Sequence, residues 1–318
     1  DAEGFVSQQD RDAPVAVAPI LRRQLDDVRR EEVLIWPTFR NLALGRAMLA
    51  ERAAGAAFRY AKRLPHAIEV IAFADEEGAR FQTSFLASRA YLGRFDPALL
   101  ERRDADGVRF DEAMRAAGLD PAAIAATPRD PATLAAYVEV HIEQGPVLLE
   151  AGAPLGVVTA IAGGTRHRVT VAGVAGHAGT VPMASRRDAL AAAAEMVLAV
   201  EARARTGGGL VGTVGLLEGR DGTGNVIPGH VEFTVDLRSG DDAVREAAER
   251  DVFARCEAIA AKRGVTVAVR RNHAVRATPC SPRLQALLAG RVEAVGAPVR
   301  RLASGAGRDA MVLAEATS

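Results

Sequence analysis

Apolar and polar positions follow no single pattern in the first part of the chain. Residues 1–46 mix runs of acidic and basic side chains without a clean period, so they predict no element. Residues 47–62 are rich in alanine and favour a helix. Residues 67–74 (AIEVIAFA) form a short apolar run with β-branched side chains, which is typical of a buried strand. We therefore expect the first helix and the first strand in these two segments.

Two further features precede a change of pattern at Gly163 and Gly164. Residues 83–127 carry helical patches that glycines separate from one another. Residues 136–142 (AYVEVHI) alternate in polarity and lead into the turn signal Gln-Gly-Pro at 144–146. This alternation predicts a second strand.

Residues 165–276 predict one compact unit of strands and helices. Strands are expected at 168–172, 210–217, 231–237 and 265–270, and helices at 185–205 and 241–262. Asp188 falls in the first turn of the first helix, where the helix dipole favours a carboxylate. The order β-α-β-β-α-β is the ferredoxin-like, split βαβ arrangement. We therefore expect an α/β protein whose first domain (1–164) resumes at 277–318 after an inserted domain at 165–276.

The composition excludes several classes of partner. The 318 residues include 40 basic and 40 acidic side chains, whereas nucleic acids and anionic membranes attract basic proteins. The longest apolar stretch, around residues 189–200, contains Glu195 and is shorter than the roughly 20 residues that span a bilayer. We identify no signal peptide, and two cysteines are too few for a disulfide framework. We therefore expect a cytoplasmic protein without nucleic-acid or membrane partners.

Two acidic side chains follow the first predicted strand directly. Glu76 and Glu77 lie in the segment DEEG, and ligands of open α/β sheets bind at the carboxyl ends of strands. One carboxylate could hold a cation while the other removes a proton from water. The alternative is that both are solvated loop charges.

Two histidines also stand where they could act. His141 ends the second predicted strand and could bind zinc, for which imidazole is the commonest protein ligand; a hydrogen-bonded structural histidine is the alternative. His177 lies among glycines in GVAGHAGTVPM (173–183), and their conformational freedom could place one imidazole. That segment could equally be a glycine-rich connection between strands.

A possible carboxylate site involves Asn225, in NVIPG, and Arg238, in VDLR. A guanidinium holds a carboxylate through two hydrogen bonds, and an amide can supply another. The alternative is an arginine that ends a strand at the surface. The glycine-containing segments at 225–229 and 304–307 lack the Gly-Lys-Ser/Thr of a phosphate loop.

Together these segments resemble one family. They are ADEEGARF (74–81), HIEQGP (141–146), AGHAGTVPM (175–183), NVIPG (225–229), VDLR (235–238) and SGAGRDA (304–310). Their order and spacing, over about four fifths of the chain, are similar to the metal-dependent amidohydrolases related to aminoacylase and carboxypeptidase G. The branch is that of allantoate amidohydrolase, N-carbamoyl-L-amino acid hydrolase and β-ureidopropionase.

The resemblance implies a catalytic α/β domain with a two-metal site and a ferredoxin-like lid that also forms a homodimer. It implies that Glu76 is the general base, that Glu77 and His141 bind metal, and that Gln144 contacts the substrate. It further implies that His177 stabilises the tetrahedral intermediate in a neighbouring active site. Asn225 and Arg238 would hold the substrate carboxylate. The expected cofactors are two divalent ions, zinc or else manganese, cobalt or nickel.

The chain also departs from the family pattern. Gln24 stands where the family has a histidine ligand, and Ile35 stands where it has the aspartate that bridges both metals; Asp26, the supporting aspartate, is kept. Arg308 replaces the histidine of a Gly-His-Asp motif, and the last histidine ligand is expected beyond residue 318. Of five expected ligands, two remain. Because metal affinity depends on ligand number, these replacements argue against tight binding of two metals.

Three explanations for these departures remain open: an incomplete copy of an active enzyme, a decayed relative, or a non-catalytic dimer. We expect a hydrolase that cleaves a linear C–N bond of a carbamoyl- or ureido-substituted carboxylic acid. The alternative is a metal-depleted, non-catalytic dimeric homologue. A dipeptidase or aminoacylase of the wider clan is less favoured, because HIEQGP and NVIPG are similar to the carbamoyl branch.

Overall fold

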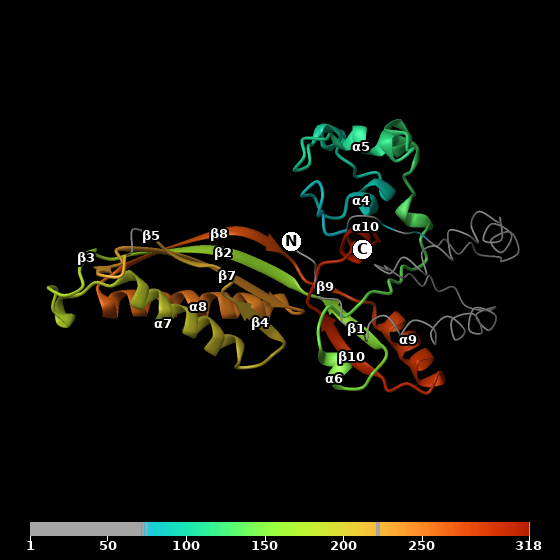
Figure 1. Ribbon diagram of the computed structural model, residues 1–318. Coiled ribbons are helices and arrows are strands. Elements are labelled where there is room, and N and C mark those ends of the chain that lie inside the picture. Colours follow the sequence, from blue (N-terminus) through green and yellow to red (C-terminus); the bar gives the residue numbers. More distant parts are fainter. Residues whose placement is uncertain (1–70, 72, 74–75, 221–222, 318) are drawn as a thin grey trace, which may run out of the picture. The chain divides into compact units, whose positions relative to one another are not determined.

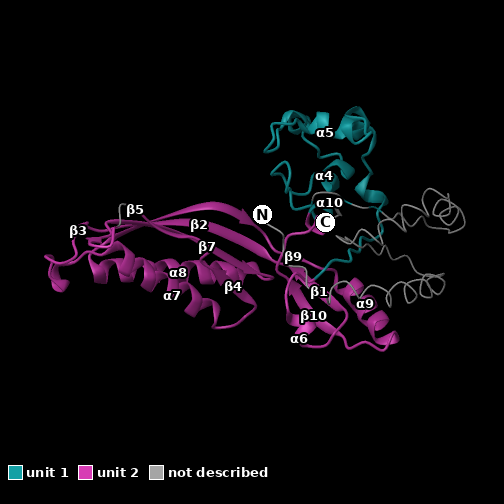
Figure 2. Cartoon of the chain, in the orientation of Figure 1, with its two compact units in different colours: residues 1–142, 312–318 teal, residues 143–311 magenta. Residues whose placement is uncertain are grey.

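The computed structural model describes residues 71, 73, 76–220 and 223–317 (Figure 1). The chain divides into two compact units, one of residues 1–142 and 312–318 and one of residues 143–311 (Figure 2). The expected helix at 47–62 lies outside the described residues, as does most of the expected strand at 67–74. Each unit is described by itself.

The larger unit contains an antiparallel sheet of five strands. These are β2 (Gly163–Ala172), β4 (Leu210–Thr213), β5 (Leu217–Arg220), β7 (His230–Ser239) and β8 (Thr266–Val275). The order is β4-β7-β2-β8, and β5 pairs with the other part of β7. Helices α7 (Ala189–Ala204) and α8 (Asp242–Arg263) cover one face (Figure 1). The predicted α/β class and the βαββαβ order are therefore confirmed.

The alternation of β7 explains why only one face of this sheet is covered. Val231, Phe233, Val235 and Leu237 are fully buried and pack with the apolar sides of α7 and α8. The residues between them are polar and only half-buried, because successive side chains of a strand point to opposite faces. Cys256 on α8 belongs to the same core, where burial raises the pKa of its thiol to about 11.

Two local details of this unit differ from the prediction. The single strand expected at 210–217 is two strands, and between them the Thr234 hydroxyl accepts the backbone N–H of Leu216 at 3.1 Å. Asp188 is not in the first turn of α7 but caps it, because its carboxylate accepts hydrogen bonds from the backbone N–H groups of Leu190 and Ala191. In both places a side-chain oxygen accepts a backbone N–H that has no partner in the strand ladder or in the first turn of the helix.

A second, smaller sheet in the same unit was not predicted. Strand β1 (Gly156–Ile161) pairs in parallel with β10 (Arg300–Ser304) and antiparallel with β9 (Thr278–Pro279). Helix α9 (Pro282–Ala294) packs on β1 through Val157, Ala289 and Val292, and α6 spans Val147–Glu150. β9 has only two residues and β10 begins with two exposed arginines, so neither has a clear strand pattern. The β-branched residues of β1 do favour a strand, but none was expected there.

The smaller unit consists of short helices around an aromatic core. It holds α4 (Leu86–Tyr91), α5 (Phe110–Ala116), the three-ten helices η3 (Pro97–Glu101), η4 (Pro121–Ala126) and η5 (Pro131–Thr133), and residues 312–317 of α10 (Asp309–Thr317). Its core contains Phe73, Tyr91, Leu92 and Leu313. The strand predicted at 136–142 is wrong within the described residues, where only Val140 takes part in a β-bridge.

Asp-Pro-Ala recurs at the starts of all three of these three-ten helices. In each, the aspartate side chain accepts a hydrogen bond from the backbone N–H two residues later, and the proline occupies the first helical position.

No helix among the described residues combines the length and the apolar composition needed to cross a membrane.

One buried histidine links the large sheet to α8. His167 on β2 is 2% exposed, and its Nε2 lies 3.0 Å from Oε1 of Glu249. Its Nδ1 is buried without a hydrogen-bond partner, and the ring packs edge-on against Phe253. This environment suits a neutral imidazole that donates from Nε2. Burial lowers the pKa of His167, and the opposing charge of Glu249 does not overcome that effect.

Acidification should therefore destabilise this unit through His167. A histidine whose pKa is lowered by folding contributes stability that is present above its unfolded pKa of about 6.5 and is lost as the pH falls below it. We expect the Tm of the wild type to fall between pH 7 and pH 5, and the fall to be smaller in His167→Gln. The measurement is thermal unfolding across this range, with His230→Gln, a half-exposed position on the same sheet, as control. Equal slopes in wild type and His167→Gln would contradict the assignment.

Candidate functional site

Two glutamates and a histidine meet in the smaller unit. Oε2 of Glu76 lies 3.2 Å from Nε2 of His141, and each of these side chains is 10% exposed. Glu139 completes the group, since one ligand atom from each of the three residues lies within 4.8 Å of the others. The structure thus brings together Glu76 and His141, which lie 65 positions apart in the chain.

The hydrogen bonds of His141 indicate what this group requires. Its Nδ1 lies 2.7 Å from the backbone oxygen of Ile142, which can only accept, so Nδ1 carries a hydrogen. Its Nε2 faces the Glu76 carboxylate. Either Nε2 is also protonated, or it offers its lone pair to a cation shared with the carboxylates. Two carboxylates in one half-buried group favour the presence of such a positive charge.

The donor set fits a divalent metal ion. Three protein ligands with one position left open is the pattern of catalytic zinc sites, and carboxylate and imidazole also suit manganese, cobalt and nickel. Histidines that bind metals commonly donate their second ring N–H to a carbonyl, as His141 does to Ile142. Ligand atoms at 4.8 Å would need to approach slightly, since two ligands about 2.1 Å from one ion are at most about 4.2 Å apart.

A tight turn places Glu76 in this group. Gly78 has a φ of +65°, and an added Cβ there would lie 2.5 Å from the backbone carbon of Thr83. The turn is closed by a hydrogen bond of 3.1 Å from the backbone N–H of Phe85 to the carbonyl of Glu76. The glycine of the DEEG motif is therefore required by both backbone conformation and space.

The sequence singled out His141, Glu76 and Glu77 but missed Glu139. In the structure Glu77 is exposed, and its neighbour Glu76 is the residue that meets His141. Glu139 could have been found from the alternation of AYVEVHI, because residues two apart in an extended segment share a side. Gln24 and Ile35, the replaced metal ligands, lie outside the described residues.

The larger unit carries the other residues singled out by the sequence, and His177 and Asn225 lie together in it. His177 is in β3 (Gly176–His177), which pairs with β6 (Val226–Ile227), and the backbone N–H of Ala178 donates to the carbonyl of Asn225 at 2.9 Å. Nδ1 of the exposed His177 accepts the backbone N–H of Gly179 at 3.0 Å. A neutral His177 therefore carries its hydrogen on Nε2, the atom that can donate to a ligand.

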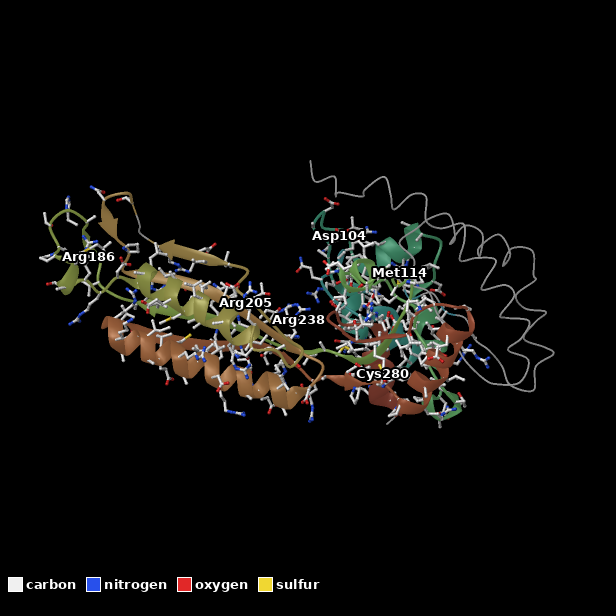
Figure 3. The ribbon with its side chains drawn as sticks, turned by 90° about the horizontal axis from the view of Figure 1, so that it is seen from below. Asp104, Met114, Arg186, Arg205, Arg238 and Cys280 are labelled. Carbon is white, nitrogen blue, oxygen red and sulfur yellow. The ribbon has the colours of Figure 1, made fainter. Side chains whose placement is uncertain are left out.

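Arg238 lies at the other end of β7. Its Nε and Nη2 donate to the two carboxylate oxygens of Asp236 at 2.8 and 2.9 Å, and its Nη1 donates to the carbonyl of Gly305 at 3.0 Å. Figure 3 shows Arg238 at the opposite end of this sheet from Arg186, whose guanidinium donates to Ala178 beside His177.

The two members of the expected carboxylate clamp are thus far apart in one chain. Asn225 precedes β7, and eight strand residues at roughly 3.3 Å each put His230 about 26 Å from Arg238. Gln144 is exposed in a turn with a φ of +57°. Arg308 is 5% exposed, and its Nε donates to the hydroxyl of Ser304 at 2.8 Å.

Comparisons with known proteins agree with this architecture. Residues 159–264 match the peptidase dimerisation domain. The chain is 45% identical over 249 residues to N-carbamoyl-L-amino acid amidohydrolase of Geobacillus stearothermophilus, covering 78% of this chain and 61% of that one. It is 40% identical to allantoate deiminase of Arabidopsis thaliana, covering 80% of this chain and 54% of that one.

A solved structure supports the same relationship. A hydantoinase/carbamoylase family amidase from Burkholderia ambifaria matches with a TM-score of 0.69 and 36% identity, covering 78% of this chain and 60% of that one. The chain thus spans about three fifths of the length of these relatives. Residues 159–264, in the larger unit, match the peptidase dimerisation domain, and the chain is similar to amidohydrolases that act on N-carbamoyl amino acids and on allantoate.

Proposed function

We propose that this protein hydrolyses a linear C–N bond of a carbamoyl- or ureido-substituted carboxylic acid. The observation that carries the proposal is the half-buried group of Glu76, Glu139 and His141, whose donors fit a divalent metal. The names of the relatives supply the substrate class, because they describe enzymes of N-carbamoyl amino acids and of allantoate. The products would be ammonia and carbon dioxide, or a related pair.

We assign the roles as follows. Glu76 takes a proton from the attacking water, and His141 binds metal with Glu139 beside it. Glu77 is the second metal ligand that the resemblance implies. Gln144 contacts the substrate, and Arg238 holds its carboxylate. A divalent ion bound at this site would supply Lewis-acid polarisation of the scissile carbonyl and would lower the pKa of water. Glu76 is within hydrogen-bonding distance of His141, so a base at that position could reach water beside a metal bound by His141.

A homodimer accounts for the separation of Asn225 and Arg238. We place His177 and Asn225 of one copy in the site of its partner, where the Nε2–H of His177 would stabilise the charge that develops on the carbonyl oxygen. The match to a dimerisation domain supports this arrangement. In domain terms, 165–276 would be the lid, and 1–164 and 277–318 would belong to the catalytic domain.

An exposed apolar face offers a surface for the second copy. Leu190, Ala194 and Leu198 recur at four-residue spacing on α7 and are exposed, with Leu198 at 62%. Val211, on the adjoining edge strand β4, is 58% exposed. An unpaired sheet edge beside an apolar helix face is suited to pairing with another chain.

One observation favours a second candidate function. Gln24 and Ile35 stand where the related enzymes have a metal-binding histidine and the bridging aspartate, so fewer ligands than expected are present. The chain would then be a non-catalytic dimeric homologue that has lost its metals. Metal content separates the two functions: the enzyme should hold about two zinc, manganese, cobalt or nickel ions per subunit, and the homologue none.

The first prediction concerns the metal site. Manganese or zinc titrated into the protein should bind in a manner measurable by calorimetry. Binding should be lost in His141→Ala and weakened by at least about 10- to 100-fold in Glu139→Gln, since loss of even an outer partner of a metal ligand costs that much. Glu101→Gln, with a side chain 75% exposed in the same unit, is the matched control. Unchanged affinity in His141→Ala would exclude the site.

A pair of variants separates the roles of Glu76 and Glu77. Glu76→Gln should keep the metal and lose turnover by about 10²- to 10⁴-fold, the usual contribution of a general base. Glu77→Gln should lose the metal. The measurements are metal content by elemental analysis and ammonia release from N-carbamoyl-L-alanine. Because Glu76 is the residue that meets His141, the reverse result is a real alternative and would exchange the two roles.

The carboxylate of the substrate provides the test of substrate class. Arg238→Lys should not rescue activity, because an ammonium cannot reproduce the planar pair of donors. Catalytic efficiency on N-carbamoyl-L-alanine should fall about 30- to several-thousand-fold, the effect of removing one partner from a desolvated charge pair. The fall should be much smaller on the corresponding amide. Equal falls on acid and amide would remove the carboxylic acid from the proposed function.

The dimer is tested at its apolar face. Leu198→Glu should convert a species of about twice the chain mass of 33.4 kDa into a monomer, because a carboxylate in an apolar interface is strongly unfavourable. Sedimentation at micromolar concentration measures this. Leu149→Glu is the control, since Leu149 is 83% exposed and lies away from α7. A wild-type monomer would remove the proposed role of His177 in a partner's site.

A further inference from the structure

Asp236 and Arg238 form the most completely bonded ion pair on the uncovered face of the large sheet. Both residues lie on β7 two positions apart, so their side chains leave the same side of the strand. Each carboxylate oxygen of Asp236 accepts one hydrogen bond from the Arg238 guanidinium, at 2.8 and 2.9 Å. This two-bond geometry fixes the plane of the guanidinium as well as its position.

The carbonyl of Gly305 adds a third constraint. It accepts from Nη1 of Arg238 at 3.0 Å, so the guanidinium is held on a second side by a group 67 residues away from Arg238 in the chain. An arginine side chain loses considerable rotamer entropy when it is ordered. Asp236 and Gly305 impose that order before any ligand arrives, so the binding of a substrate carboxylate would not bear that cost.

Arg166 compensates the charge of Asp236. It lies directly opposite Asp236 on β2, and its Nε donates to Oδ2 of Asp236 at 3.0 Å. Burial by itself would raise the pKa of Asp236, but the hydrogen bonds and charges of Arg238 and Arg166 outweigh it and lower that pKa. Asp236 is therefore ionised near neutral pH. Two guanidinium groups face this one carboxylate, so the three side chains together carry one positive charge, which favours a negatively charged ligand.

We propose that Asp236 is a positioning residue that fixes Arg238 to receive the carboxylate of the substrate. This inference rests on the proposed function, in which Arg238 binds that carboxylate. Asp236 itself does not contact the substrate and acts only through the orientation of Arg238. The role of Arg166 is to offset the charge of Asp236, so that the site attracts an acid rather than repelling it.

Glu232 provides a matched control. It lies four residues earlier on the same face of β7 and also binds two arginines, Arg168 at 2.8 Å and Arg220 at 3.3 Å. It is not bonded to Arg238 in any interaction described above. A loss that comes only from breaking an ion pair on this sheet should therefore appear equally in Glu232→Gln and Asp236→Asn.

The experiment compares wild type, Asp236→Asn and Glu232→Gln on N-carbamoyl-L-alanine and its amide. Asp236→Asn should raise KM for the acid by about 10- to 100-fold, the range known when the support of a binding group is removed. KM for the amide should change less than about twofold, and kcat should change little for either compound. Glu232→Gln should leave both KM values unchanged.

A second readout follows Arg238 directly. The ¹⁵N–¹H signal of its Nε–H, assigned by its loss in Arg238→Lys, should exchange slowly with water in the wild type. It should exchange faster in Asp236→Asn, because that variant removes the carboxylate that accepts the Nε–H hydrogen bond. It should stay slow in Glu232→Gln, because Glu232 does not accept that hydrogen bond. This measurement needs no turnover.

Each outcome decides between the alternatives. A lower KM for the acid in Asp236→Asn would mean that Asp236 competes with the substrate, and equal losses on acid and amide would mean a structural role. Either result, or an unchanged Nε–H signal, overturns the inference. A wild type that neither binds nor hydrolyses N-carbamoyl-L-alanine overturns the proposed function instead, and slow exchange of the Arg238 signal would show that the ion pair is nevertheless formed.

Discussion

The alternation of side chains along β7 is the constraint on which the larger unit depends. One side of the strand supplies Val231, Phe233, Val235 and Leu237 to the core beneath α7 and α8. The other side carries the polar residues, among them the arginine proposed to bind the substrate. A shift of register by one residue would exchange the two sets. One register of β7 therefore fixes both the apolar core and the position of Arg238 on the opposite face.

The length of the same strand separates the proposed functional groups. Asn225 and His177 are at one end of the sheet, and Arg238 is at the other, so one copy of the lid does not gather them around one ligand. A second copy of the chain would bring these groups together, and the exposed apolar face of α7 beside the edge strand β4 could bind that copy. In the proposed function dimerisation and catalysis therefore depend on each other, because His177 and Asn225 would act in the site of a second copy.

The group of Glu76, Glu139 and His141 in the smaller unit depends on charge rather than on strand register. Two carboxylates and an imidazole lie close together with little exposure, and the second ring nitrogen of His141 is committed to a backbone carbonyl. A proton or a bound cation would offset the negative charge of these carboxylates, in addition to the other contacts that Glu76 and Glu139 make. In the larger unit Arg166 has a comparable effect, because its positive charge offsets the carboxylate of Asp236 near the proposed carboxylate site.

The sequence by itself determined the βαββαβ order, the position of Asp188 at the start of α7 to within a residue or two, and two members of the candidate metal site, Glu76 and His141. Local periodicity predicts the helices and strands, because an element with one buried face has apolar residues at the regular spacing of a helix or a strand. Only the tertiary structure decided that β1, β9 and β10 form a sheet, since short strands are defined by their neighbours. Only it joined Glu139 to Glu76 and His141, and Asp236 to Arg238. Such contacts depend on where separate segments meet and on where each side chain points, and neither is recorded in the periodicity of a single segment.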